Sequence, residues 1–110
     1  MSIEMIDFCY ELKGRGFSLG IISNFSSVHK YALNPDLFSP IIYTGNTGLS
    51  KPDLAIFARF CQQANCQPNE CLFIDDSYVN VSAAKDFGME TFLFTSIPDF
   101  IEKTQLLGLI

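Results

Sequence analysis

Apolar and polar positions along the chain follow two periodicities, one typical of helices and one of buried strands. The segment from Ile3 to Lys13 repeats its apolar residues at helical spacing, and a Gly-Arg-Gly sequence ends the pattern after Lys13. The repeating apolar positions are Ile6, Cys9, Tyr10 and Leu12. The spacing predicts an amphipathic helix at the start of the chain.

Four short apolar runs predict buried strands, and helical segments separate them. The runs cover Phe17–Ser23, Ile41–Thr44, Leu72–Ile74 and Thr91–Phe94. Short helical turns are expected over Ser26–Leu33, where Asn34-Pro35 ends the pattern. Strands that alternate with helices and are apolar throughout predict a parallel sheet with helices on both faces.

Three longer helices are predicted in the second half of the chain. Pro52 suits a first helical turn, and the helix after it carries an apolar stripe formed by Leu54, Phe57, Cys61 and Ala64. Ser77 is the expected N-cap of a helix over Tyr78–Phe87, with Gly88 at its C′ position. Pro98 opens a last helix toward Leu107. The sequence contains no repeat, low-complexity segment or linker, so residues 1–110 form one domain.

The composition and the net charge of the chain disfavour some classes of binding partner. The 110 residues are 48% hydrophobic with eleven Phe, enough for a packed core, and the net charge is −5. A negative charge disfavours nucleic acid and anionic membrane surfaces. It also repels phosphorylated metabolites, unless a bound cation inverts the local field.

The sequence predicts a cytoplasmic protein. No apolar run approaches the roughly 18 residues that a membrane helix needs, and the first residues lack a basic region followed by an apolar one. The four cysteines are then expected to be reduced. Cys61, Cys66 and Cys71 have a C-x4-C-x4-C spacing that fits no common zinc pattern. We therefore interpret Cys61 and Cys71 as small apolar residues on a helix and at a strand start.

Polar side chains follow three of the predicted strands. Ser23-Asn24 comes after the first, Lys51 lies in the segment after the second, and Asp75-Asp76 comes after the third. Ligands of such sheets bind outside the carboxyl ends of the strands. A hydroxyl and an amide can hydrogen-bond phosphate oxygens, an ammonium can neutralise them, and paired carboxylates can hold Mg²⁺. Together these groups predict a site for a phosphoryl group and its metal.

Each of these groups has an ordinary structural explanation when it is taken alone. Ser23-Asn24 suits a turn, and Lys51-Pro52 suits a helix start with a solvated lysine. The pair Asp75-Asp76 carries more weight, because burying two like charges without a cation is costly.

The stretches IISNFSS, GLSKPDLAIF and LFIDDSYVNVSAAKDFGMETFLF resemble the second, third and fourth motifs of the haloacid dehalogenase (HAD)-like hydrolases. The resemblance extends from about residue 12 to residue 94. It implies a Rossmann-like core, Mg²⁺ as cofactor and an aspartyl-phosphate intermediate. Response regulators use similar groups on a similar sheet, but their acids come first in the chain, whereas here the order is Ser23, Lys51, Asp75.

The resemblance also implies a role for each matching residue. Ser23 would hydrogen-bond the transferred phosphoryl group, with Asn24 beside it. Lys51 would balance the negative charge of nucleophile and phosphate. Asp76 would be the direct Mg²⁺ ligand with Asp75 next to it, and Asn80 would brace their loop. Adjacent carboxylates favour a phosphatase over a true dehalogenase, which needs no metal.

One part of the family pattern is missing. The first motif of the family is a strand ending in D-x-D that supplies the nucleophile and the general acid, and this sequence contains no D-x-D. Asp7, the only Asp before Ser23, lies in the first predicted helix, and the single histidine, His29, is expected on the surface. We therefore expect a HAD-like core that lacks its N-terminal central strand and cap, and that is inactive alone.

The missing strand would leave two apolar sheet edges that invite pairing. We expect either that these edges close on each other at about 4.8 Å, or that a second copy or a partner chain supplies the strand. Two hypotheses for function follow. The chain is part of a phosphatase acting on a small phosphorylated metabolite once it is complemented, or it is a non-catalytic interaction or oligomerisation module that keeps the fold.

Overall fold

The structure is a computed structural model that describes residues 3–23, 36–44, 48 and 51–110. From residue 54 onward helices and parallel strands alternate along the chain, as the sequence predicts. The elements are α1 (Ile3–Gly14), β1 (Ile21–Ser23), β2 (Ile41–Tyr43), α2 (Leu54–Ala64), the 3-10 turn η2 (Pro68–Glu70), β3 (Leu72–Asp75), α3 (Tyr78–Phe87), β4 (Glu90–Leu93) and α4 (Ile97–Leu106). The turns expected over 26–33, Asn24 and His29 lie outside the described residues.

The strands form two separate parallel pairs rather than one sheet. In one pair Ile21 of β1 is in register with Ile41 of β2, and in the other Leu72 of β3 is in register with Glu90 of β4. The expectation that the edges of the first and third strands close on each other is therefore wrong for this structure. These are the two strands that were expected to flank a central strand, and β1 pairs only with β2 and β3 only with β4 among the described residues.

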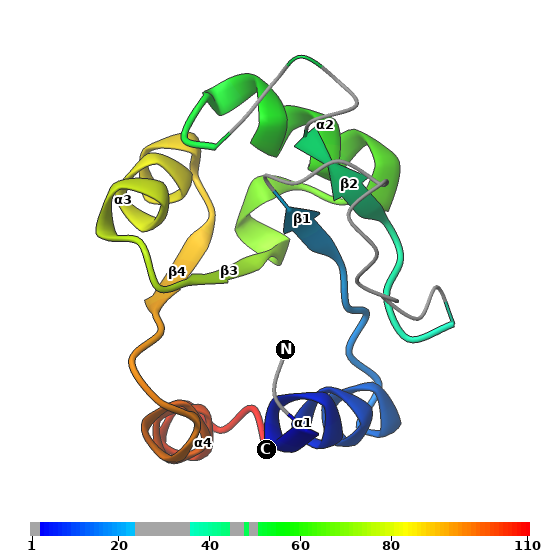
Figure 1. The fold of residues 1–110 in the computed structure, drawn as a ribbon, viewed down its shortest axis with the longest axis vertical. Helices are drawn as coiled ribbons and strands as arrows, with labels where there is room; N and C mark the ends of the chain where they lie inside the picture. The colour runs from blue at the N-terminus through cyan, green and yellow to red at the C-terminus, as the bar shows by residue number, and fades with distance from the viewer. Residues whose placement is uncertain (1–2, 24–35, 45–47, 49–50) are drawn as a thin grey trace.

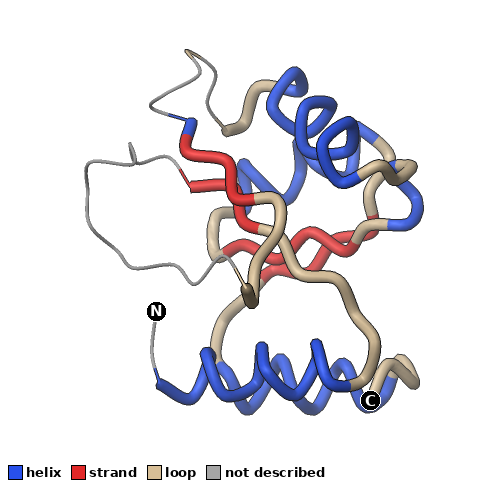
Figure 2. The backbone as a smooth tube through the Cα atoms, turned by 90° about the vertical axis from the view of Figure 1, so that its right-hand side faces the viewer, coloured by secondary structure: helices blue, strands red, loops and turns tan. Residues whose placement is uncertain are grey.

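Helices cover the strands from both sides. Figure 1 shows α2 and α3 on one side of the strands and α1 and α4 on the other, and Figure 2 shows the same layers from the side. The layer of α2 and α3 packs through a core that includes Ile56, Phe57 and Ala84. This arrangement confirms the α/β, Rossmann-like fold class.

The opposite layer is held by aromatic rings and by a small second core. The ring of Phe8 in α1 meets that of Phe100 in α4 edge-on at 5.3 Å between centroids, and Phe100 also contacts Phe92 of β4 at 5.1 Å. Cys9 packs with Leu37 and neighbouring side chains over β1 and β2. The helices α1 and α4 therefore lie in one layer beneath both strand pairs (Figure 1).

In two helices the predicted apolar stripe is confirmed in part: Phe57 and Cys61 of α2 and Cys9 of α1 are buried, and one predicted position in each helix is exposed. In α2 the side chains of Ile56 and Phe57 are fully buried, whereas Leu54 is 49% exposed. Leu54 stands in the first turn, where the helix extends past its contacts with the strands. In α1 Phe8 and Cys9 are buried and Tyr10 is 52% exposed, because each residue turns the next by about 100° around the helix axis.

The absence of a side chain at Gly20 lets α2 approach the pair formed by β1 and β2. A Cβ at Gly20, just before β1, would lie 2.5 Å from the ring of Phe60 and 3.1 Å from the carbonyl oxygen of Pro40. The backbone at Gly20 thus accepts an aromatic side chain of α2 against it. No helix in the described part of the chain is both long and apolar enough to cross a bilayer.

Candidate functional site

Asp75 is the centre of a polar cluster at the carboxyl end of β3. Its Oδ2 accepts a hydrogen bond from Nζ of Lys51 at 2.8 Å and one from Nδ2 of Asn80 at 3.3 Å. The backbone N–H of Ser77 donates to its Oδ1 at 2.9 Å. Three donors from three parts of the chain therefore fix one carboxylate.

The ion pair between Lys51 and Asp75 is largely shielded from water. The two side chains are 14% and 9% exposed, and the ammonium of Lys51 also lies 5.9 Å from the centroid of the Phe73 ring. Burial by itself raises the pKa of Asp75, but the hydrogen bonds from Lys51, Ser77 and Asn80 and the charge of Lys51 bring it below its ordinary value. Asp75 is thus held as a carboxylate.

The loop and helix after β3 place these groups by local chemistry. Ser77 is the N-cap of α3, as predicted, and its Oγ accepts the N–H of Asn80 at 3.4 Å. The cap sets Asn80 in the first turn of α3, from where its amide reaches back to Asp75. At the other end of α3, Gly88 adopts the left-handed conformation with φ 112°.

Asp76 differs from its neighbour. Its side chain is exposed, and no hydrogen bond or ion pair involves its carboxylate among the residues that the structure describes. Lys51 is paired with Asp75, whereas the carboxylate of Asp76 is exposed to solvent. An accessible carboxylate beside a fixed one suits Mg²⁺, which binds through one or two carboxylates and keeps several waters.

Ser23 belongs to a different strand pair from Asp75. Ser23 ends β1, paired with Tyr43, in the strand pair that does not contain Asp75. Asn24 lies outside the described residues. The structure thus brings together Lys51, Asp75 and Asn80, while the convergence of Ser23 on them stays a prediction.

Sequence reasoning missed one donor and understated one acid. The backbone N–H of Ser77 binds Asp75, a contact that follows from the predicted N-cap because the capping residue directly follows the acid pair. Asp75 was expected only to accompany Asp76, yet Asp75 receives all the contacts. The alternation of buried and exposed positions past a strand end indicates which of two adjacent acids turns inward.

Comparison with known proteins identifies one matching family and a similar protein. The family model of the haloacid dehalogenase-like hydrolases matches residues 3–88. A sesquiterpene phosphatase from Aspergillus oryzae is 31% identical over 96% of this chain and 57% of its own length.

Two solved structures share the fold. A HAD-like family hydrolase from Porphyromonas gingivalis has a TM-score of 0.81 at 23% identity, over 96% of this chain and 57% of its own. A HAD family enzyme from Bacteroides thetaiotaomicron, crystallised with magnesium and inorganic phosphate, has a TM-score of 0.77 at 21% identity, over 88% of this chain and 55% of its own. This chain thus spans little more than half the length of each of these three relatives.

Proposed function

Because the chain belongs to the haloacid dehalogenase-like hydrolases, we propose that it forms part of a magnesium-dependent phosphatase acting on a small phosphorylated metabolite. The observation that carries this proposal is the shielded ion pair of Lys51 and Asp75 next to the accessible carboxylate of Asp76. Such a pair fixes the geometry of the strand end and leaves one acid for a metal. The relatives named above support the assignment through a phosphatase and a magnesium and phosphate complex.

Asp76 would hold Mg²⁺. Asp75 would orient Asp76 through the backbone that joins the two residues. When bound, the metal would supply positive charge for the phosphoryl oxygens. Without a cation, the one positive and two negative charges of Lys51, Asp75 and Asp76 would repel a phosphate ester. The chain's own residues thus account for the need for a metal.

The remaining residues would position the phosphoryl group. Lys51, itself held by Asp75, would balance charge on the phosphate, and Ser23 would donate a hydrogen bond to a phosphoryl oxygen, with Asn24 beside it. Asn80 would keep Asp75 in place through its 3.3 Å hydrogen bond. All these roles are electrostatic or positional.

The nucleophile would come from outside these 110 residues. The sequence has no D-x-D, and charge stabilisation without a nucleophile does not complete covalent phosphoryl transfer. We propose that a segment encoded upstream or a second chain supplies a strand ending in D-x-D between β1 and β3. The 110-residue chain alone would then bind but not turn over.

The substrate would carry an apolar group. An open hollow next to the site is lined mainly by apolar side chains of the starts of α2 and α3, among them Leu54, Tyr78 and Val79. These three are 49%, 73% and 61% exposed. An alcohol with a hydrocarbon chain would cover them, which agrees with the name of the Aspergillus oryzae relative.

Phosphate release from p-nitrophenyl phosphate with Mg²⁺ tests the proposal, with the chain alone and with the chain joined to an upstream segment that ends in D-x-D. We expect turnover only in the second case. Asp76→Asn should lower that rate at least about 100-fold, and the matched variant Asp7→Asn, at an exposed position of α1, should leave it unchanged. Turnover by the isolated chain that Asp76→Asn abolishes would contradict the proposed need for a second segment.

Comparing farnesyl phosphate with glycerol phosphate in the same assay tests the substrate class. A higher kcat/KM for farnesyl phosphate is expected. A higher kcat/KM for glycerol phosphate would contradict the apolar-substrate proposal but not the proposed phosphatase activity.

A second candidate function is a non-catalytic interaction or oligomerisation module. It is favoured by the two separate strand pairs, because β1 and β3 each hydrogen-bond to one neighbouring strand only within the described chain. Analytical ultracentrifugation distinguishes the cases. A concentration-dependent dimer that lacks phosphatase activity, even with the upstream segment, would favour the module. A monomer at all concentrations would count against it.

A further inference from the structure

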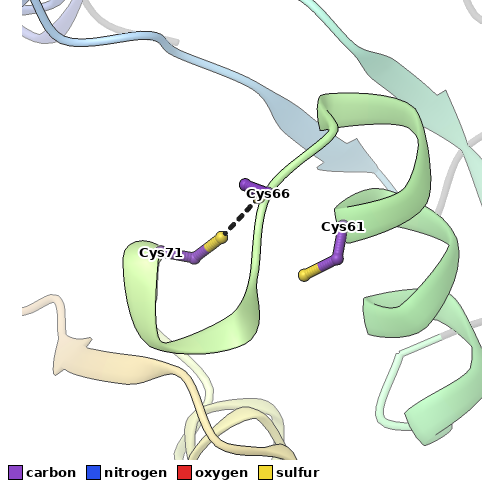
Figure 3. Close-up of side chains that lie close together, drawn as sticks. All are labelled: Cys61, Cys66 and Cys71. Atoms are coloured by element: carbon purple, nitrogen blue, oxygen red, sulfur yellow. Dashed lines mark hydrogen bonds between the residues drawn. The ribbon is translucent and has the colours of Figure 1, made fainter.

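Three cysteine side chains converge at the end of β3 away from the candidate site. The Sγ atoms of Cys61, Cys66 and Cys71 lie within 4.8 Å of one another, and those of Cys66 and Cys71 are 3.1 Å apart. Figure 3 shows Cys61 projecting from α2 toward the loop that carries the other two. Cys61 is buried, while Cys66 and Cys71 are half-buried.

Backbone hydrogen bonds build this arrangement. The helix α2 ends at Asn65 in the left-handed conformation with φ 55°. The N–H of Cys66 then bonds to the carbonyl of Cys61 at 3.1 Å, which closes a Schellman motif. The N–H of Cys71 bonds to the carbonyl of Pro68 at 3.0 Å and ends the 3-10 turn. Two turns of fixed geometry therefore carry the three thiols.

The cluster is distinct from the site at Asp75. Cys71 comes directly before β3 and Asp75 ends it, and four residues of strand span about 13 Å. Residues of the two groups share no hydrogen bond or ion pair in the part of the chain that the structure describes. A hollow lined by Cys61, Cys66 and Gln67 opens the cluster to solvent.

We propose that Cys61, Cys66 and Cys71 bind a thiophilic metal ion, Zn²⁺ or Cu⁺. Thiolates bind Zn²⁺ at about 2.3 Å, so the sulfurs of three ligands around one ion stand about 3.8–4.0 Å apart. The observed sulfur separations of 3.1 Å and up to 4.8 Å bracket this value. Small side-chain rotations of Cys66 and Cys71 would equalise them. Soft thiolate ligands select these ions over Mg²⁺.

Zinc would complete its coordination with a water from the hollow. Glu70 lines the same hollow, but its carboxylate already accepts the N–H of Gln67 at 2.8 Å. Cu⁺ would need only the three sulfurs. On binding, the thiols release their protons to water and no electrons move.

A disulfide between Cys66 and Cys71 fits the chemistry less well. Forming a disulfide requires an oxidant that removes two electrons from the two thiols, whereas metal binding moves no electrons, and a bound metal ion deprotonates its thiol ligands. A disulfide would also leave Cys61 without a role. Simple apolar packing, the interpretation from sequence, accounts for burial and predicts no metal affinity.

Titration of the reduced 110-residue chain with Co²⁺, as a spectroscopic substitute for Zn²⁺, and with Cu⁺ against a chromophoric chelator tests the proposal. We expect one equivalent bound, with cobalt–thiolate charge-transfer bands for Co²⁺. Cys66→Ala should weaken binding at least about tenfold. The matched variant Cys9→Ala, which removes a thiol from the other core, should bind as the unsubstituted chain does.

Thermal unfolding separates metal binding from packing. One equivalent of Zn²⁺ or Cu⁺ should raise the Tm by at least about 5 °C in the unsubstituted chain and in Cys9→Ala, and not in Cys66→Ala. Equal affinity of both variants for the metal, or absence of thiolate bands, would overturn the proposal. A Cys66–Cys71 disulfide formed by hydrogen peroxide in a chain that binds neither ion would overturn it in favour of a redox pair. The larger response, to Zn²⁺ or to Cu⁺, identifies the ion.

Discussion

At the scale of single residues, the adjacent acids Asp75 and Asp76 at the end of β3 differ in their contacts and their exposure. Asp75 turns inward and takes three donors, while Asp76 stays accessible to solvent. The sequence placed both acids, Lys51 and Asn80 at the right ends of their elements. It did not assign the ion pair, because Lys51 and Asp75 are 24 positions apart in the sequence and only folding brings them together.

Asp75 makes the free energy of unfolding depend on pH in the acidic range. Its pKa in the folded chain lies below the ordinary value of 3.8, so its stabilising effect is complete above that pH and is lost as the pH falls toward the lower, folded value. We expect the free energy of unfolding, measured in urea, to fall less steeply below pH 3.8 in Asp75→Asn than in Asp7→Asn. Parallel pH profiles of the two variants would contradict the contacts assigned to Asp75.

Replacing Lys51, the cationic partner of Asp75, tests the same ion pair. Lys51→Met leaves a carboxylate that is only 9% exposed without its positive partner, and we expect a loss of about 3 kcal/mol in the free energy of unfolding. Lys103→Met is the matched control, because the Lys103 side chain is 55% exposed and pairs with Asp99 across one helical turn. It should cost less than about 1 kcal/mol in urea unfolding. Similar losses in both would show that the Lys51 pair is solvated.

At the scale of elements, caps and glycines fix where the helices begin and end. Ser77 and Gly88 bound α3 as predicted, and Ser96 caps α4 in the same way through the N–H of Asp99. The signals at Ser77 and Gly88 are local, which explains why sequence alone located the ends of α3. The strands were located less well, since β1 begins at Ile21 and not at Phe17, because a strand extends only as far as its neighbour pairs with it.

Gly88 offers a test of the α3 terminus. Its φ of 112° strains any residue with a Cβ, although a Cβ there would meet Pro68 at an ordinary 3.5 Å. We therefore expect Gly88→Ala to cost about 1–2 kcal/mol in the free energy of unfolding, through the backbone alone. Gly14→Ala, at a helix end with nothing within 4 Å of the new methyl and no positive φ, should be neutral or slightly stabilising. Equal effects in thermal melts would count against this account.

At the scale of the whole molecule, two strand pairs are joined by the helices above and below them. The α2 and α3 layer spans both pairs through Ile42 of β2 and Phe73 of β3, which pack against the same core. The lower layer joins α1 to α4 through the rings of Phe8 and Phe100. The helices of both layers thus connect two strand pairs that do not hydrogen-bond to each other.

Phe100 is the test of that lower layer. It is 1% exposed and contacts the rings of Phe8, Phe92 and Phe94, so Phe100→Ala should lower the free energy of unfolding by about 3–4 kcal/mol. Leu106→Ala, 80% exposed on the same helix, should change it by less than about 0.5 kcal/mol. Guanidinium unfolding measures both. A small loss for Phe100→Ala would mean that α4 docks without this ring.

The sequence by itself determined most of the elements, the caps of α3, the α/β class and the strand end that carries Asp75 and Asp76, because each depends on residues that are neighbours along the chain. Only the tertiary structure decided that Lys51 pairs with Asp75, that β1 and β3 stay in separate sheets, and that three cysteines at an unfamiliar spacing lie together. Each of these depends on how separate elements pack against one another, and no local pattern encodes that packing.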